Sequence, residues 1–205
     1  MLFFTLAKAW MVGVAIAAPV GPIGMLCIRK TLELGFLGTI AVGLGAALAD
    51  SIFGFIAGLG LTAISHFLLE KVAVIKIIGG IFLFYLAYKE VRSEPISSKI
   101  SIQHKTLSKV AVEIFLLTLT NPMTILCFIG IFSTIGGGGN SIVELSTIVL
   151  GVFLGSMTWW LVLGFIIVKI KHKLPEMWIN RIRYISAAIL AGFGIVAIVS
   201  VIVPN

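Results

Sequence analysis

Long apolar runs, separated by short charged or glycine-rich segments, follow one another along the whole chain. A helix rises 1.5 Å per residue, so it needs about 20 residues to cross the roughly 30 Å hydrocarbon core of a bilayer. The chain divides into runs of about that length. The sequence therefore predicts an all-α integral membrane protein with six transmembrane helices, at about residues 9–28, 36–61, 72–88, 110–135, 142–168 and 184–203.

The composition excludes the other structural classes. Of the 205 residues, 60% are hydrophobic and 11% are charged, with a mean hydropathy of +1.18, whereas a soluble domain has about 25% charged residues. Neither of the two cysteines lies in a CxxC motif or in a Cys/His cluster with metal-binding spacing. We therefore expect no structural metal and no cofactor, and we do not expect an enzyme.

Lysine and arginine residues collect in three of the connecting loops. Of the 15 basic residues, 12 follow the first, third or fifth run, and the others are Lys8, Lys71 and Lys76. Because positively charged loops stay in the cytoplasm, both termini should lie outside, and Lys71 and Lys76 should anchor the outer end of the third run. The net charge of +7 then follows from topology. We expect no nucleic-acid partner, since these charges lie on short connectors.

The first and fourth runs share a sequence pattern at an offset of 100 residues. Residues 21–28 (GPIGMLCI) align without a gap with residues 121–128 (NPMTILCF), and the proline, leucine and cysteine are identical. Each half, at about residues 1–88 and 110–205, contains three runs, so the second half crosses the membrane in the opposite sense. The sequence therefore predicts a single transporter domain built as a 3+3 inverted repeat, with a cytoplasmic linker at residues 89–109.

Prolines interrupt the first and fourth runs near their centres. Proline has no N–H group and its ring clashes with the preceding helical turn, so Pro19, Pro22 and Pro122 should break both helices. Proline is also favoured as the first residue of a helix, so Gly21-Pro22 and Asn121-Pro122 each predict the start of a half-helix. The exposed N–H groups and positive dipole end of each start would attract a carboxylate. Alternatively, the prolines only kink the helices for packing.

The second run carries an aspartate, Asp50, close to its middle. A carboxylate at that depth costs about 2.5–3.5 kcal/mol, so it should face a polar cavity, where a cation or a dissociable proton offsets the cost. The alternative is a structural aspartate that caps backbone groups freed by the helix breaks. Together, the acid and the half-helix starts would hold a zwitterion such as an α-amino acid.

Several further residues could belong either to a transport pathway or to the packing and the membrane interface. Glu113 is interpreted as an interfacial charge rather than a proton relay, whereas Trp159 and Trp160 could line a pathway or pack in the core. Small residues four positions apart allow close helix packing. We interpret the glycine pairs of the second and fifth runs in this way: Gly54 with Gly58, and Gly151 with Gly155.

Four short motifs follow one another along the chain. They are Ala-Pro-Val-Gly-Pro at residues 18–22, Gly-Leu-Gly-Ala-Ala-Leu-Ala-Asp at 43–50, Ile-Ile-Gly-Gly at 77–80 and Thr-Asn-Pro at 120–122. In this order they resemble the lysine exporter (LysE/RhtB) family of amino-acid exporters, although the family's common Asn-Pro-Lys is Asn-Pro-Met here. The resemblance implies export of an amino acid or related metabolite across a bacterial cytoplasmic (inner) membrane, coupled to the proton-motive force.

These observations define an expected substrate site and mechanism. The site consists of residues at the helix breaks and along the second run: Pro19, Gly21, Pro22, Gly45, Asp50, Asn121 and Pro122. We expect this site to lie at the bilayer midplane and the two halves to rock about it by alternating access. Asp50 would bind either the substrate ammonium or a proton and thereby couple the two. The expected partners are an amino acid, protons and membrane lipid, and a homo-oligomer is compatible with the sequence.

The competing interpretation is a thiol–disulfide electron carrier of the DsbD/CcdA type that uses Cys27 and Cys127. Each cysteine lies five residues after its proline, about 7.5 Å along its half-helix, but in opposite directions. The two thiols should thus be roughly 15 Å apart in depth, whereas a disulfide needs Cα atoms within about 7 Å. We therefore favour buried apolar roles for both cysteines.

Overall fold

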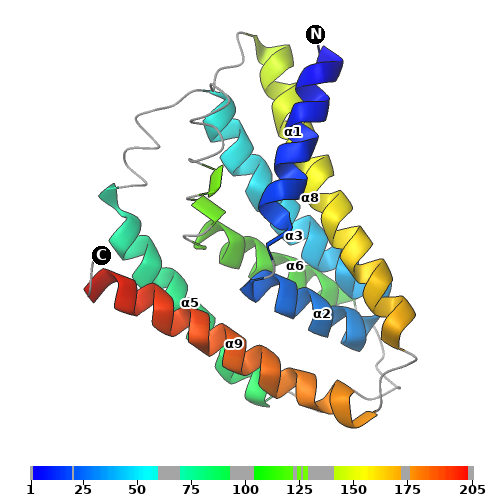
Figure 1. The fold of residues 1–205 in the computed structure, drawn as a ribbon, viewed down its shortest axis with the longest axis vertical. Coiled ribbons are helices and arrows are strands. Elements are labelled where there is room, and N and C mark those ends of the chain that lie inside the picture. Colours follow the sequence, from blue (N-terminus) through cyan, green and yellow to red (C-terminus); the bar gives the residue numbers. More distant parts are fainter. Residues whose placement is uncertain are drawn as a thin grey trace.

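The computed structural model describes residues 2–19, 21–59, 70–92, 104–121, 124–125, 127–128, 141–171 and 176–202. Every regular element in these ranges is helical (Figure 1), as the predicted fold class requires. The helices are α1 (Leu2–Ala17), α2 (Pro22–Leu34), α3 (Phe36–Gly58), α5 (Val72–Arg92), α6 (His104–Leu119), α8 (Ile142–Lys171) and α9 (Glu176–Ile202).

Four stretches are long and apolar enough to cross a membrane: α3, α5, α8 and residues Tyr184–Ile202 of α9. Helices α1 and α2 form a fifth candidate if they are taken together as one bent span, since they are bent by 84° relative to each other. The chain is therefore a multi-pass membrane protein. The remaining predicted span, residues 110–135, begins in α6 and ends outside the described residues.

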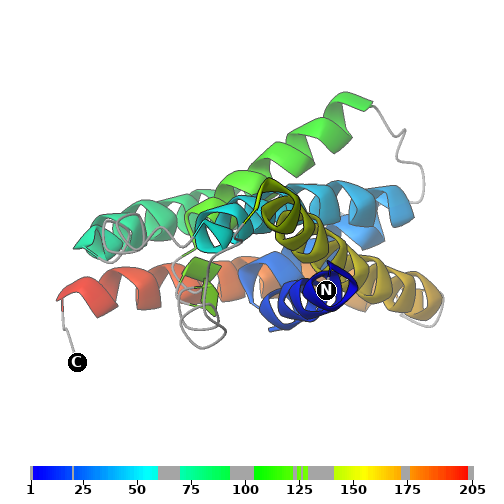
Figure 2. The same ribbon diagram turned by 90° about the horizontal axis from the view of Figure 1, so that it is seen from above.

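The helices form two groups (Figure 1). Helices α1, α3 and α8 pack together, with α1 parallel to α8 and α3 antiparallel to it, and α6 lies against α3. Helices α5 and α9 form an antiparallel pair to one side of this group, which Figure 2 shows from above. Helix α2 contacts α3, α8 and α9, so it joins the two groups.

Glycines allow the helices of the larger group to approach closely. A Cβ added at Gly155 would collide with the carbonyl oxygen of Trp10, and one at Gly151 would lie 2.5 Å from the Cβ of Ala9. Gly54 of α3 faces α8 in the same way, with an added Cβ 3.2 Å from a valine side chain. Larger side chains at these positions would push the helices apart, so the predicted packing role of these glycines is confirmed.

Charged side chains meet near the C-terminal ends of α2 and α5. Arg29 is fully buried and forms ion pairs with Glu33, at 2.7 Å between Nη2 and Oε1, and with Glu90 of α5. Lys30 binds the other carboxylate oxygen of Glu33 at 2.7 Å. We call these four residues the ionic cluster. The cluster connects the helix that follows the first break to the α5–α9 pair.

Two further contacts bring α6 and α8 to the same end of the molecule. Lys89 of α5 forms an ion pair with Glu113 of α6. Lys171 of α8 donates a hydrogen bond of 2.8 Å from its Nζ to the carbonyl oxygen of Leu32. Glu113 therefore lies in the middle of α6, in an ion pair with a lysine from the last turn of α5.

Candidate functional site

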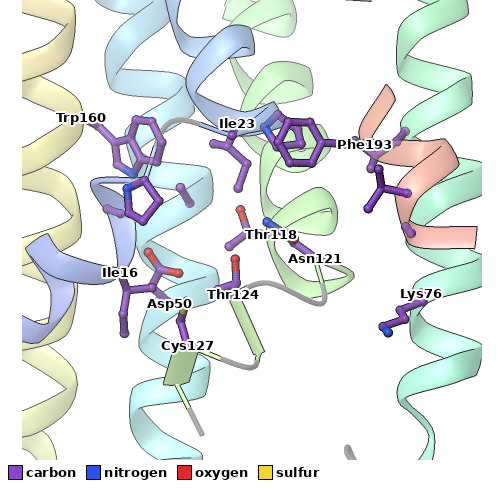
Figure 3. A pocket seen from close by; sticks show the side chains of 18 of the residues that line it. Ile16, Ile23, Asp50, Lys76, Thr118, Asn121, Thr124, Cys127, Trp160 and Phe193 are labelled. Atoms are coloured by element: carbon purple, nitrogen blue, oxygen red, sulfur yellow. The ribbon is translucent and has the colours of Figure 1, made fainter. Parts of the chain in front are cut away.

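A cavity of about 390 Å³ lies between the two helix groups. Its walls come from the junction of α1 and α2, the middle of α3, the end of α6, and parts of α5, α8 and α9. A volume of this size is typical of a site for a small organic molecule. Most of the wall is apolar, and the side chains with polar or sulfur atoms are Asp50, Lys76, Thr118, Asn121, Thr124, Cys127, Trp160 and Ser200 (Figure 3).

Asp50 lies on α3 and lines this cavity. The residue is 3% exposed, and its Oδ2 atom accepts a hydrogen bond of 2.7 Å from the hydroxyl group of Ser156 on α8. Ser156 in turn accepts a hydrogen bond of 3.2 Å from the indole N–H of Trp160, one helical turn further along α8. The acid is therefore held against the cavity by a chain of two donors and is turned away from lipid.

The hydrogen bond of Asp50 argues against the alternative that this aspartate only caps backbone groups at a helix break. An aspartate that caps freed backbone would accept hydrogen bonds from N–H groups at a helix break, but this bond comes from a side chain on a neighbouring unbroken helix. Ser156 is neutral, so the bond does not compensate a buried negative charge. The arrangement thus leaves a carboxylate whose charge a bound cation or a proton can balance.

The N-terminus of α2 opens into the same cavity. Helix α1 ends at Ala17, and Pro22 is the first residue of α2, with Gly21 as an N-cap that makes no side-chain hydrogen bond. Gly21, Pro22 and Ile23 all line the cavity. Because the first N–H groups of a helix have no partner inside it, this start presents the positive end of a helix dipole to the cavity.

Helix α6 also ends beside the cavity, where Thr118 and Asn121 line the wall. It ends at Leu119, and the backbone N–H of Ile125 donates to the carbonyl oxygen of Asn121 at 3.3 Å. The corresponding bond at the α2 start runs from the N–H of Met25 to the carbonyl oxygen of Gly21, at 3.1 Å. The two bonds lie at the same offset of 100 residues as the sequence pattern.

The structure brings five of the predicted site residues to the cavity, namely Pro19, Gly21, Pro22, Asp50 and Asn121. Gly45 lies elsewhere, because an added Cβ would collide with the carbonyl oxygen of Ala111; it marks a close contact between α3 and α6. Five residues before Asp50, it points about 140° away around the helix axis. Pro122 lies outside the described residues.

Sequence reasoning missed two residues of this site and left a third open. The sequence predicts Lys76 at the membrane interface with Lys71, but Lys76 lines the cavity. The signal for Ser156 in the sequence is a hydroxyl group in the middle of an apolar run. Trp160 lines the cavity and binds Ser156, whereas Trp159 packs against the hydrophobic core.

The two cysteines occupy different environments. Cys27 is fully buried in the hydrophobic core, with its Sγ 3.9 Å from the hydroxyl oxygen of Thr31, whereas Cys127 lines the cavity. Both are free thiols. Over the ranges that the structure describes, no group of three or more histidine, cysteine, aspartate or glutamate side chains could hold a metal ion.

Comparisons with known proteins identify the family of the chain. The family model of the LysE type translocator matches residues 14–201. The chain is also 25% identical, over 189 residues, to the "Putative amino acid efflux protein YcgF" of Bacillus subtilis (strain 168), with 89% of each chain covered. No solved structure matches the chain. Since the family model spans most of the sequence, the chain belongs to the LysE type translocator family, whose members are transporters.

Proposed function

We propose that this protein exports an amino acid, or a similar small zwitterion, from a bacterial cytoplasm by alternating access at the cavity. The observation that carries the proposal is the cavity's pair of opposite binding features. Asp50 would bind the substrate ammonium, and the open N-terminus of α2 would bind the carboxylate. The similarity to a protein named as an amino acid efflux protein supports the same substrate class.

The helix contacts support an inverted repeat. If the two halves are exchanged, α1 corresponds to α6, α3 to α8, and α5 to α9. Helix α1 packs on α8 while α6 packs on α3, and α3 with α8 and α5 with α9 pack on each other. Every one of these contacts is therefore matched after the exchange, and the hydrogen bonds at Gly21 and Asn121 match as well. Such repeats are the usual framework for a site that opens alternately to each side.

The distribution of charge supports an orientation. Arg29, Lys89 and Lys171 lie at the end of the molecule that holds the ionic cluster, which would face the cytoplasm because basic residues stay on that side. Lys76 lies near the start of α5 and Ser200 near the end of α9, so both are at the helix ends far from the ionic cluster. Both also line the cavity. The cavity would then lie nearer the outer surface, with a closed cytoplasmic side, and both termini would be outside.

Asp50 would also couple transport to protons. One carboxylate can bind an ammonium group or a proton but not both, so release of the substrate outside would leave Asp50 ready to accept a proton. The proton would leave on the cytoplasmic side. For a substrate with net positive charge, exchange of this kind offsets the cost of moving charge against the membrane potential, about 2.3 kcal/mol per 100 mV.

Purified protein in liposomes, loaded with labelled amino acids under an imposed pH gradient, tests the proposal. Asp50→Asn keeps the shape of the side chain but removes its charge. A charged hydrogen bond contributes about 1.5–3 kcal/mol, so substrate affinity should fall roughly 10- to 150-fold and pH-driven exchange should stop. Glu144→Gln, which removes an acid at the start of α8 outside the cavity lining, should have no such effect.

The same liposomes separate export from redox transfer. An electron carrier that uses a cysteine pair would need Cys27, whereas an exporter would not. Cys27→Ala should therefore retain amino-acid exchange. Two results would refute the export mechanism. One is normal pH-driven exchange by Asp50→Asn, and the other is a Cys27→Ala variant that loses both amino-acid transport and thiol reduction.

A further inference from the structure

Lys76 gives the cavity a fixed positive charge opposite Asp50. It is on α5, and Asp50 is on α3; Figure 3 shows them on opposite sides of the cavity, with the Lys76 side chain extending from its helix toward the interior. Among the lining residues that the structure describes, these two are the charged ones. No described group forms a hydrogen bond or ion pair with Lys76.

The position of Lys76 differs from that of an ordinary interfacial lysine. Lys71, directly before the first residue of the same helix, is exposed and lies outside the cavity lining. Lys76 is five residues further on, about 7.5 Å deeper along the helix, and it is only partly exposed. Its ammonium group therefore approaches a cavity instead of the surrounding solvent.

The wall around Lys76 strengthens its effect on a ligand. The other lining residues from α5 and α9 are mostly apolar: Leu83, Phe193, Val196 and Ala197, together with Ser200, whose hydroxyl group donates to the carbonyl oxygen of Ala197. Charges interact more strongly beside apolar side chains than in water. An anion in this part of the cavity would be attracted to Lys76, and a cation would be repelled.

We propose that Lys76 determines substrate specificity by binding a carboxylate of the transported amino acid and excluding amino acids with basic side chains. This inference rests on the proposed export function. With the substrate ammonium at Asp50, a carboxylate group would lie toward Lys76. It is either a side-chain carboxylate, with the α-carboxylate at the start of α2, or an α-carboxylate that Lys76 and the start of α2 bind together. A lysine or arginine substrate would instead place a second cation near Lys76.

Exchange in liposomes of acidic, neutral and basic amino acids tests the proposal. Wild-type protein should exchange acidic or neutral amino acids and reject basic ones. Lys76→Met should raise the KM for the accepted substrates about 10- to 100-fold with little change in maximal rate, since a charged hydrogen bond is lost. Lys76→Arg should restore the KM, and Lys76→Glu should admit basic amino acids. Lys71→Met is the matched control and should behave as wild type.

A comparison of acidic with neutral amino acids also shows which carboxylate of the substrate Lys76 binds. If Lys76→Met impairs acidic and neutral amino acids alike, Lys76 binds the α-carboxylate; if it impairs acidic ones alone, Lys76 binds the side chain. Equal behaviour of Lys76→Met and Lys71→Met, or exchange of basic amino acids by the wild type, would overturn the proposal while leaving the export function intact. A wild-type protein that moves no amino acid would overturn the export function itself.

Discussion

The ionic cluster and the cavity both place charge inside the molecule, but they compensate it in different ways. In the cluster, fully buried Arg29 is paired with Glu33 and Glu90 from the chain itself. In the cavity, Asp50 has a neutral hydrogen-bond donor, and Lys76 on the opposite wall has no described partner. A buried charge is costly without compensation. The chain itself compensates Arg29 in the first region, whereas in the second the charges are left for a ligand or a proton to balance, as the proposed function requires.

The largest expected effect on stability is at Arg29. Arg29→Ala would leave two carboxylates without their shared partner, and breaking a buried ion pair costs about 3–5 kcal/mol. Thermal unfolding in detergent should show a large loss for this variant and a much smaller one for Asp50→Asn. Arg92→Ala is the control, since Arg92 lies exposed over the ring of Tyr88 at the same end of α5. Equal losses for Arg29→Ala and Asp50→Asn would break the distinction between the two regions.

An intermediate effect is expected at Ser156. Ser156→Ala removes the hydroxyl group that donates to Asp50 and accepts from Trp160. The net value of such a bond is about 1 kcal/mol, so the KM for substrate should rise roughly fivefold. Ser51→Ala is the control, because its hydroxyl group binds the carbonyl oxygen of Ala47 within α3. An unchanged KM in Ser156→Ala would show that Asp50 does not depend on this donor.

The smallest effect is expected at Lys89, whose side chain is 35% exposed in its ion pair with Glu113. Exposed ion pairs contribute little because water and salt screen them, so Lys89→Ala should cost less than about 1 kcal/mol. The loss should shrink further at high salt. Measured by the same thermal unfolding, a cost as large as that of Arg29→Ala would mean that burial does not set the difference between these pairs.

Local chemistry explains what was predictable. Proline at position 22 sets the start of α2 because it has no N–H and a fixed φ. Asp50 was predicted to avoid lipid because an acid among apolar residues has few alternatives. By contrast, the closeness of Gly45 to Asp50 in the sequence predicts a shared site, yet the two residues face different neighbours. Proximity along a helix does not establish a shared site.

The sequence by itself determined that the chain is an all-helical membrane protein of the LysE type, where α2 begins, and that Asp50 is buried. These properties depend on hydropathy, proline chemistry and motif order, which are local along the chain. Only the tertiary structure decided that Lys76 reaches the cavity, that Ser156 holds Asp50, and that Arg29 joins α2 to α5. The physical reason is that the faces which meet depend on how each helix is rotated and at what angle it crosses its neighbours. Contacts between residues distant in the sequence determine that rotation and that angle.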